Sequence, residues 1–467
     1  MFNKSDLIKL NDYLWEIPKS YQKDMRVPAR IYITEKMLRE AVKDNSLNQL
    51  VNLTTLPGIV KYALAMPDIH EGYGAPIGGV FATRLPEGVI SPGAVGYDIN
   101  CGIRLLKIPF QREEIKGKIE SLVEGIFSAV PSGVGKGGKF KLNISEIDKI
   151  LGKGIECLKE KGHATEKDIK HCESGGCLEA DACFVSDLAK KRGKDQLGTL
   201  GAGNHFIEIQ EVTEIYDEKS TKNLGLKEGQ VTVLIHSGSR GLGHQVATDY
   251  IRLFMQVMNK YNIFLPDREL AAVPFFTEEG KKYFLAMGAA ANFAWANRQM
   301  ITYLIRKVFK KVLGLKEESL DLVYDIAHNI AKIETYDING KDEELLVHRK
   351  GATRAFVEQS VLIPGSMGTN SYVLLGQPLA EKECFSSVCH GAGRAMSRHE
   401  AKRKISGREV LQQLAKRGII VKSGSLSGLA EEAPLSYKNI DEVIEVVHQA
   451  GLAKKIVQLK PLAVIKG

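Results

Sequence analysis

The sequence lacks several features that would assign it to a membrane or secreted class. No run of 18 or more uncharged apolar residues occurs, which excludes a transmembrane helix. The first residues, MFNKSDLIKLNDYLWEIP, mix charges with apolar side chains, so no signal peptide is expected. The seven cysteines are an odd number and include no C-x-x-C pair. We therefore expect neither a disulfide scaffold nor a zinc knuckle, and we expect a cytoplasmic protein without a membrane partner.

Common nucleotide-enzyme motifs are also incomplete. Gly133–Lys139 (GVGKGGK) matches the glycines and lysine of a P-loop, but Phe140 replaces the Ser or Thr that would hold Mg²⁺. We interpret this segment as a loop able to touch phosphate. His399–Glu400 lacks the second histidine of a zincin helix. No strong lysine-centred nucleotidyl-transfer motif is evident either.

The composition is that of a large folded protein with a modest basic excess. Of 467 residues, 44% are hydrophobic and 26% charged, so the chain can bury a sizeable core. Subtracting 56 acidic from 64 basic residues gives a net charge of +8, which permits a polyanionic partner. No linker, low-complexity block or repeat divides the chain. We therefore predict a single body.

Local patterns predict both strands and helices. Residues 231–236 and 320–328 are short, β-branched and followed by polar turns, which indicates buried strands. Residues 205–212 alternate and predict a strand with two different faces. Residues 281–315 have helical periodicity, and 399–418 predict a helix with one or two interruptions. The fold class predicted is mixed α/β (α+β).

Four dispersed segments share one form, an apolar run next to a Gly- or Asn-rich turn with metal-binding side chains. The residues concerned are Asp98 and Cys101 in GYDINCG, Asn204, His205 and Glu208 in LGAGNHFIE, His236 and Arg240 in VLIHSGSRG, and His328 in YDIAHN. A single histidine of this kind is usually a core residue, but four such segments favour a shared site. Thiolate, imidazole and carboxylate together suit Zn, Mn, Fe or Co. Because the candidates exceed one tetrahedral shell and a thiolate can bridge, two ions are expected, an arrangement suited to phosphoryl chemistry.

A fifth segment, CHGAGRAMSR, places His390 beside two glycines and two arginines, Arg394 and Arg398. Small neighbours allow a bulky group to approach the imidazole, and guanidinium forks match phosphate oxygens. His390 is therefore a candidate nucleophile for a phosphoryl or nucleotidyl group. The turn IPGSMGTNSY offers further backbone N–H groups to phosphate.

These motifs, in this order, resemble the RtcB family of GTP-dependent RNA ligases. GYDINCG, GNHFIE, HSGSRGLGH, AHN, PGSMGT, HGAGR-MSR, PLAVIKG and MPDIHEGYGAPIGGV carry the resemblance, which extends over residues 66–467. It implies one ligase domain over residues 1–467. It also implies a mixed α/β body with stacked β-sheets around a deep metal-containing cleft and helices outside.

The resemblance implies a role for each matching residue. Two Mn²⁺ ions would share Cys101, with Asp98 and His205 on one ion and His236 and His328 on the other. His390 would attack the α-phosphate of GTP and carry GMP. The expected guanylate contacts are Asn204, His205, Glu208, Ser366, Arg394, Tyr437 and Lys466. The expected RNA-phosphate contacts are Arg240, Arg394 and Arg398.

The implied reaction joins RNA ending in a 2′,3′-cyclic phosphate or 3′-phosphate to RNA with a 5′-hydroxyl, in tRNA splicing or RNA repair. A monomer is expected, and archease is a candidate activating partner. One alternative is a dinuclear metal-dependent phosphodiesterase or phosphatase with water as nucleophile. Another is a non-catalytic RNA-binding protein, which fits the +8 charge but gives no reason for gathering metal ligands in glycine-rich turns.

Overall fold

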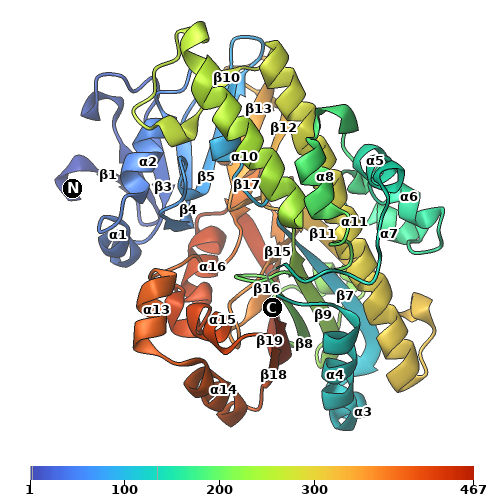
Figure 1. The fold of residues 1–467 in the computed structure, drawn as a ribbon. Coiled ribbons are helices and arrows are strands. Elements are labelled where there is room, and N and C mark those ends of the chain that lie inside the picture. The colour runs from blue at the N-terminus through green and yellow to red at the C-terminus, as the bar shows by residue number, and fades with distance from the viewer. Residues whose placement is uncertain (1, 3, 134) are drawn as a thin grey trace.

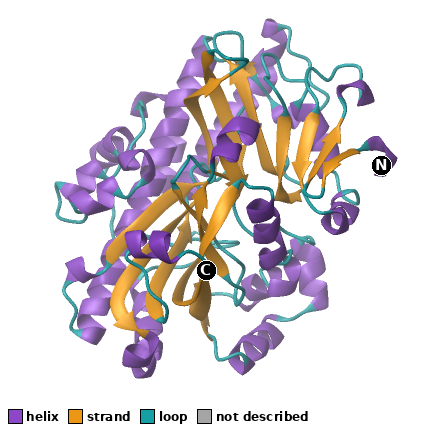
Figure 2. Ribbon diagram, turned by 180° about the vertical axis from the view of Figure 1, so that it is seen from behind, coloured by secondary structure: helices purple, strands orange, loops and turns teal. Residues whose placement is uncertain are grey.

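The computed structural model describes residues 2, 4–133 and 135–467, which fold into two large β-sheets with helices around them (Figures 1 and 2). The first sheet has the strand order β1-β2-β3-β4-β5-β13-β12. Its strands are β1 (Ile8–Asn11), β2 (Leu14–Ile17), β3 (Ala29–Tyr32), β4 (Ala63–His70), β5 (Ile77–Arg84), β13 (Asp342–Lys350) and β12 (Asn329–Asp337). All its neighbours are antiparallel except β3 and β4.

The second large sheet has the order β11-β7-β9-β8-β19-β16-β15, and β18 pairs in parallel with β19. Its strands are β11 (Asp321–Ala327), β7 (Gly102–Gln111), β9 (Gln230–Ser237), β8 (Phe206–Ile215), β19 (Ala453–Lys466), β16 (Ser371–Gly376), β15 (Ser360–Ile363) and β18 (Ile420–Ser423). Two small antiparallel ladders pair β6 (Val89–Ile90) with β10 (Val273–Pro274) and β14 (Ala352–Arg354) with β17 (Ser387–Cys389).

The helices lie outside the strands (Figure 2). The α-helices are α1 (Glu35–Ala41), α2 (Ser46–Leu53), α3 (Arg112–Ile115), α4 (Ile119–Ala129), α5 (Ile144–Lys153), α6 (Glu156–Lys159), α7 (Glu166–Lys170), α8 (Asp187–Gly193), α9 (Glu218–Leu224), α10 (Arg240–Val257), α11 (Glu278–Leu313), α12 (Pro378–Cys384), α13 (Arg398–Lys404), α14 (Gly407–Lys416), α15 (Leu426–Glu431) and α16 (Ile440–Gln449). Short 3₁₀ helices are η1 (Lys4–Asp6), η2 (Lys19–Tyr21), η3 (Pro92–Ala94), η4 (Lys116–Lys118), η5 (Glu173–Gly176), η6 (Ala182–Phe184), η7 (Met258–Tyr261), η8 (Arg268–Leu270), η9 (Glu317–Ser319) and η10 (Pro434–Ser436). No helix in the described part of the chain is both long and apolar enough to cross a membrane.

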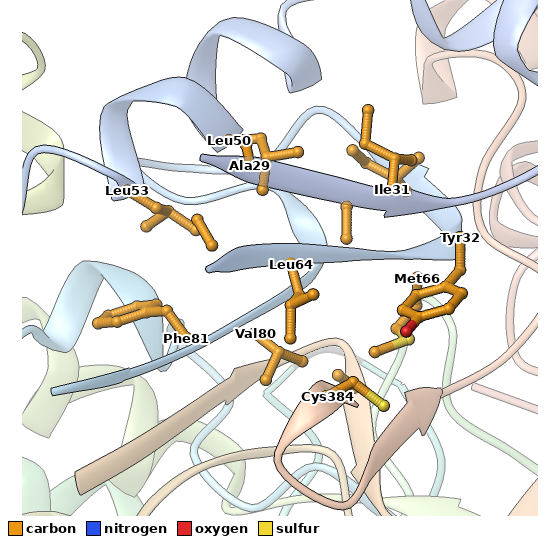
Figure 3. Close-up of a cluster of buried hydrophobic side chains, with 14 of the residues drawn as sticks. Ala29, Ile31, Tyr32, Leu50, Leu53, Leu64, Met66, Val80, Phe81 and Cys384 are labelled. Atoms are coloured by element: carbon orange, nitrogen blue, oxygen red, sulfur yellow. The ribbon is translucent and has the colours of Figure 1, made fainter. Parts of the chain in front are cut away.

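Apolar packing fixes the first sheet against its helices. Leu50 and Leu53 of α2 pack with buried side chains of β3, β4 and β5, and Cys384 of α12 lies nearby (Figure 3). Helix α11 is buried along most of its length and contacts both sheets, including β9 and β12. It therefore ties the two sheets into one body.

The mixed α/β body and its predicted elements are confirmed. Residues 231–236 lie in β9, residues 320–328 coincide with β11, and the predicted long helix is α11. The predicted interrupted helix is α13 followed by α14. Strand β8 has the two chemically different faces expected, but both are covered in its first half, so Glu208 and Gln210 are buried. The chain passes from one large sheet to the other between β11 and β12, at His328.

Candidate active site

Strand pairing brings three of the predicted metal ligands together. Cys101 immediately precedes β7, His205 immediately precedes β8, and His236 lies in β9 between them. The register pairs His236 with Ile103 on one side and with Phe206 on the other. Cys101 and His205 therefore lie on either side of His236, at the end of the sheet where the chain crosses to β12.

The ligand atoms form two groups that share the cysteine. Those of Cys101, His236 and His328 lie within 4.8 Å of one another, as do those of Asp98, Cys101 and His205. Cys101 Sγ lies 3.3 Å from His205 Nε2 and 3.2 Å from His236 Nε2. These two groups contain the residues of the two predicted ligand sets, with Cys101 in both.

The chemistry of these side chains also fits metal binding. Burial lowers the pKa of His236 and of His328 well below the usual range, so both imidazoles are neutral and can coordinate a cation. Among the described residues, the buried Nδ1 atoms of His205 and His236 have no hydrogen-bond partner. Buried polar atoms are normally satisfied, so these unpartnered atoms mark both rings as candidate ligand-binding groups.

A buried arginine that the sequence analysis missed holds this region together. Arg298 of α11 donates to both carboxylate oxygens of Asp325, to the carbonyls of Asn100 and Ser237, and to the Asn100 side chain. Asn100 precedes Cys101, and Ser237 follows His236. One guanidinium thus fixes the backbone beside two ligands. The available signal was Asn297–Gln299, a polar run within an otherwise apolar helical segment.

The HSGSRG turn provides space for Asp98. A Cβ on Gly238 would lie 2.3 and 2.4 Å from the two carboxylate oxygens of Asp98, so only glycine allows this approach. The backbone N–H of Ser239 then donates to Asp98 Oδ1 at 3.0 Å. Asp98 Oδ2 lies 2.8 Å from His205 Nε2, which links the turn to the ligand group.

The predicted nucleophile, His390, follows β17 and is oriented by Asp68 of β4. His390 Nδ1 lies 2.6 Å from Asp68 Oδ2, and the backbone N–H groups of His390 and Gly391 donate to the same oxygen at 3.0 and 3.3 Å. A carboxylate at Nδ1 favours the tautomer with its proton on Nδ1, which leaves the Nε2 lone pair free. The sequence analysis assigns no role to Asp68, which lies in the MPDIHEGYGAPIGGV segment. Its signal was a carboxylate inside a buried apolar strand.

His390 lies in a cavity of about 230 Å³ next to the metal-ligand groups. The His328 and His390 ring centroids are 4.9 Å apart. Five of the seven predicted guanylate contacts line the same cavity: Asn204, Ser366, Arg394, Tyr437 and Lys466. His236, His328 and Arg398 line it as well, whereas His205 and Glu208 do not. Residues far apart in the sequence therefore converge on one small space.

A larger cavity of about 970 Å³ adjoins the first, and Asn204 and Arg398 line both. Basic side chains around it include Arg240, Arg192 and Lys136, the last from the P-loop-like segment. Asp98 and His205 also line this cavity. The smaller space is therefore lined by the histidines of one ligand group, His236 and His328, and the larger by Asp98 and His205 of the other.

Glu432 is a second residue that the sequence analysis missed. Its carboxylate accepts hydrogen bonds from Arg394 at 3.2 Å and Arg398 at 3.3 Å, and from the Tyr437 hydroxyl. Lys466 Nζ lies 4.0 Å away. These four predicted guanylate or phosphate contacts thus surround one buried carboxylate. Both guanidinium groups already use part of their hydrogen-bonding capacity on it.

Glu208 and Lys466 are buried close to each other on neighbouring strands. Burial raises the pKa of Glu208 to about 8 and lowers the pKa of Lys466 to about 8. Glu208 Oε1 has no hydrogen-bond partner among the described residues. Glu208 lines neither of the two cavities, so its contact with the guanylate stays a prediction.

The fold and site together define a mixed α/β protein in which two candidate metal-ligand groups share Cys101 and lie beside an aspartate-oriented histidine. The family model described as "tRNA-splicing ligase RtcB" matches residues 49–467. The chain is 50% identical to "tRNA-splicing ligase RtcB" of Archaeoglobus fulgidus and 49% to that of Thermococcus kodakarensis, over 99% of each chain. It is 48% identical to "RNA-splicing ligase RtcB" of Mycobacterium tuberculosis, over 90% of this chain and 100% of the relative. The chain belongs to the RtcB family.

Proposed function

We propose that this chain is a GTP- and Mn²⁺-dependent RNA ligase that joins 2′,3′-cyclic phosphate or 3′-phosphate ends to 5′-hydroxyl ends. The proposed role is tRNA splicing or RNA repair in the cytoplasm. The observation that carries it is His390, whose Nδ1 lies 2.6 Å from Asp68 in a cavity also lined by His236 and His328. A hydrolase that activates water has no need of a covalent nucleotide on this histidine.

The proposed ligands of two Mn²⁺ ions are Cys101 with Asp98 and His205 for one, and Cys101 with His236 and His328 for the other. The donor set fits, and such ions would polarise phosphate oxygens when bound. The identity of the metal comes from the resemblance, since intrinsic affinity alone favours Zn²⁺ over Mn²⁺.

In the first step, the Nε2 lone pair of His390 forms a bond to the α-phosphorus of GTP. The bond from that phosphorus to the oxygen of the departing pyrophosphate breaks. Asp68 accepts the hydrogen bond from Nδ1–H and stabilises the positive charge that develops on the ring. Asn204, Ser366, Tyr437 and Lys466 line the cavity and would contact the nucleotide.

In the later steps, GMP passes from His390 to the RNA 3′-phosphate, and the 5′-hydroxyl attacks that phosphorus and expels GMP. Hydrolysis of any cyclic phosphate comes first. The larger cavity, with Arg240 and Arg398 on its wall, is the proposed place for RNA phosphates. From the family resemblance, we also propose that the protein is a monomer and that archease activates it.

The first test is the covalent adduct. Wild-type protein incubated with α-³²P-labelled GTP and Mn²⁺ should retain label on a denaturing gel, and the bond should be acid-labile and alkali-stable. His390→Ala should retain none, whereas His399→Ala, which changes an exposed histidine nearby, should label normally. A wild-type protein without label, or a labelled His390→Ala protein, would refute the proposal.

The second test is the origin of the joining phosphate. RNA labelled at its 3′-phosphate should keep that label in the junction when it is joined to a 5′-hydroxyl partner. Efficient joining of a 5′-phosphate to a 3′-hydroxyl would overturn the proposed direction. Hydrolysis of the labelled end without joining would instead favour the phosphodiesterase alternative.

A further inference from the structure

Lys438, between η10 and α16, joins three segments of the site without touching the cavity that contains His390. Its Nζ donates to the backbone carbonyls of Pro67, at 3.2 Å, and of Ile69. Its backbone N–H donates to the carbonyl of Gly393 at 2.9 Å. The side chain lies in a poorly solvated position, and this burial lowers its pKa to about 8.

The two carbonyls that Lys438 contacts belong to the residues on either side of Asp68. In this part of β4 the register with β5 shifts, and the recorded pairs pass from Ala65 directly to His70. The strand ladder therefore does not fix the backbone around Asp68. The Lys438 ammonium supplies hydrogen bonds there in place of a neighbouring strand.

The segment that contains Lys438 is also fixed to the loop after His390. Ala395 N–H donates to the carbonyl of Ser436 at 2.8 Å, and Arg394 and Tyr437 form an isolated antiparallel bridge. On the other side of this loop, Gly393 has a φ of +73°, and a Cβ there would lie 2.2 Å from the carbonyl oxygen of Asp68. The strand end, the nucleophile loop and the Tyr437 segment are therefore in direct contact.

We propose that Lys438 is a positioning residue for nucleotidyl transfer, which holds the backbone of Asp68 against the segment that carries Tyr437. The inference rests on the proposed function, in which His390 attacks the nucleotide. Asp68 sets the direction of the His390 ring, and Tyr437 lines the nucleotide cavity. Lys438 thus fixes the attacking atom relative to the bound nucleotide. A displacement near 1 Å at such a site can lower a rate by about 10²-fold.

Lys61 provides a matched control. Its Nζ also lies near two backbone carbonyls, those of Asp337 at 3.1 Å and Lys382 at 3.4 Å. It does not line either cavity of the site. Lys61→Met and Lys438→Met therefore remove the same chemical groups at different places.

The test measures the rate of GMP transfer to full-length, metal-loaded protein by rapid quenching over a range of GTP concentrations. In Lys438→Met the maximal rate should fall by about 30- to 100-fold while half-saturation changes less than about threefold. Lys438→Arg, which keeps the charge and donors, should recover most of the rate. Lys61→Met should match wild type. A wild-type maximal rate in Lys438→Met, or no recovery in Lys438→Arg, would overturn the proposal.

A double-mutant cycle with Asp68→Asn tests whether Lys438 acts through Asp68. In the Asp68→Asn background, Lys438→Met should lower the remaining rate by less than about threefold, because coupled residues are not additive. Fully multiplicative losses would overturn the proposal. If wild-type protein forms no adduct at all, the proposed function fails instead, so the two failures can be distinguished.

A second variant covers the case in which Lys438→Met does not fold, as judged by its unfolding transition and metal content. Lys438→Gln keeps N–H donors but shortens the side chain and removes the charge. We expect an intermediate loss of maximal rate that again nearly disappears in the Asp68→Asn background. A Lys438→Gln protein with the full wild-type rate would contradict the inference.

Discussion

The two cavities of the site are built in different ways. In the smaller one, of about 230 Å³, His390 and the neighbouring metal ligands are held by buried side chains such as Asp68 and Arg298. The larger one, of about 970 Å³, is lined partly by glycine-rich loops and by exposed basic side chains such as Lys136. Buried hydrogen bonds thus hold side chains around the first cavity, whereas the wall of the second carries exposed basic side chains.

This difference follows from the tasks proposed for them. Bond formation at phosphorus needs atoms held to a fraction of an ångström, which buried hydrogen bonds can provide. A polyanion of variable sequence can be held by phosphate contacts that tolerate movement. Substitutions near the small cavity should therefore affect covalent chemistry strongly, and those of exposed basic side chains on the wall of the large cavity should change RNA affinity only a little.

The largest effect is expected at Cys101, which belongs to both ligand groups. Cys101→Ala should lower the occupancy of both metal positions and abolish adduct formation, whereas His328→Ala should chiefly weaken one position. Native mass spectrometry counts the ions, with Cys157→Ala, a buried cysteine outside both groups, as the control. Two tightly bound ions in the Cys101→Ala protein would contradict the proposal that both metal positions depend on this thiolate.

Asp68→Asn should have the next largest effect. The amide keeps the size of the side chain but removes the charge that stabilises the His390 ring during attack. We expect the rate of GMP adduct formation to fall by about 10²- to 10⁴-fold, the usual range for such groups. RNA binding, measured by fluorescence anisotropy, should not change. An equal loss of both properties would show that the cavities are not independent.

Arg298→Met tests the buried support of the metal ligands. It removes donors from Asp325 and from the carbonyls of Asn100 and Ser237. Loss of one partner from a buried ion pair typically costs about 3 kcal/mol or more, so the free energy of unfolding should decrease by this order. Denaturant titration measures it. Metal affinity should fall in the same variant even under conditions where the protein remains folded.

Much of the fold and the ligand groups could be predicted from the sequence, because each followed a local signal. The strand β9 and the helix α11 have clear periodicity, and His236 and His328 stand where apolar runs meet polar turns. These side chains converge because the starts of β7 and β8 and the ends of β9 and β11 lie at the same edge of the second sheet. The family resemblance supplied the grouping, and the structure brings the same residues together.

The supporting residues could not be predicted in this way, since their partners are distant in sequence. Asp68 and His390 are 322 positions apart, and Arg298 contacts residues from three separate strands or turns. Glu432 gathers Arg394, Arg398 and Tyr437 only through the packing of the C-terminal segments. No local pattern distinguishes such a carboxylate from one on the surface.

A smaller effect is expected for the pH dependence of GTP binding. Burial raises the pKa of Glu208 to about 8, so in the free protein the carboxyl is mostly protonated at pH 7. If guanine binding requires the carboxylate, the proton must be released, and affinity should increase as pH rises from 7 to 8. The ionised fraction of a group with this pKa increases about fivefold between pH 7 and pH 8.

Calorimetry with the His390→Ala protein measures this binding without covalent reaction. Glu208→Gln should remove the increase, because the amide does not titrate. A rise of the same size in Glu208→Gln would assign the pH dependence to another group. Lys466, whose pKa is also lowered to about 8, should limit the gain above pH 8 as it loses its charge.

The smallest effect is expected at Lys136, on the wall of the large cavity. Its exposed ammonium can neutralise one RNA phosphate, so Lys136→Ala should weaken RNA binding a few-fold and reduce the slope of log affinity against log salt by about one. GMP transfer to His390 should proceed at the wild-type rate. Lys139→Ala is the matched control, because Lys139 is exposed in the same loop but does not line the cavity. Equal losses of RNA affinity in both variants would indicate a diffuse charge effect. Slower formation of the GMP adduct in Lys136→Ala would show that this loop also affects the chemistry in the small cavity.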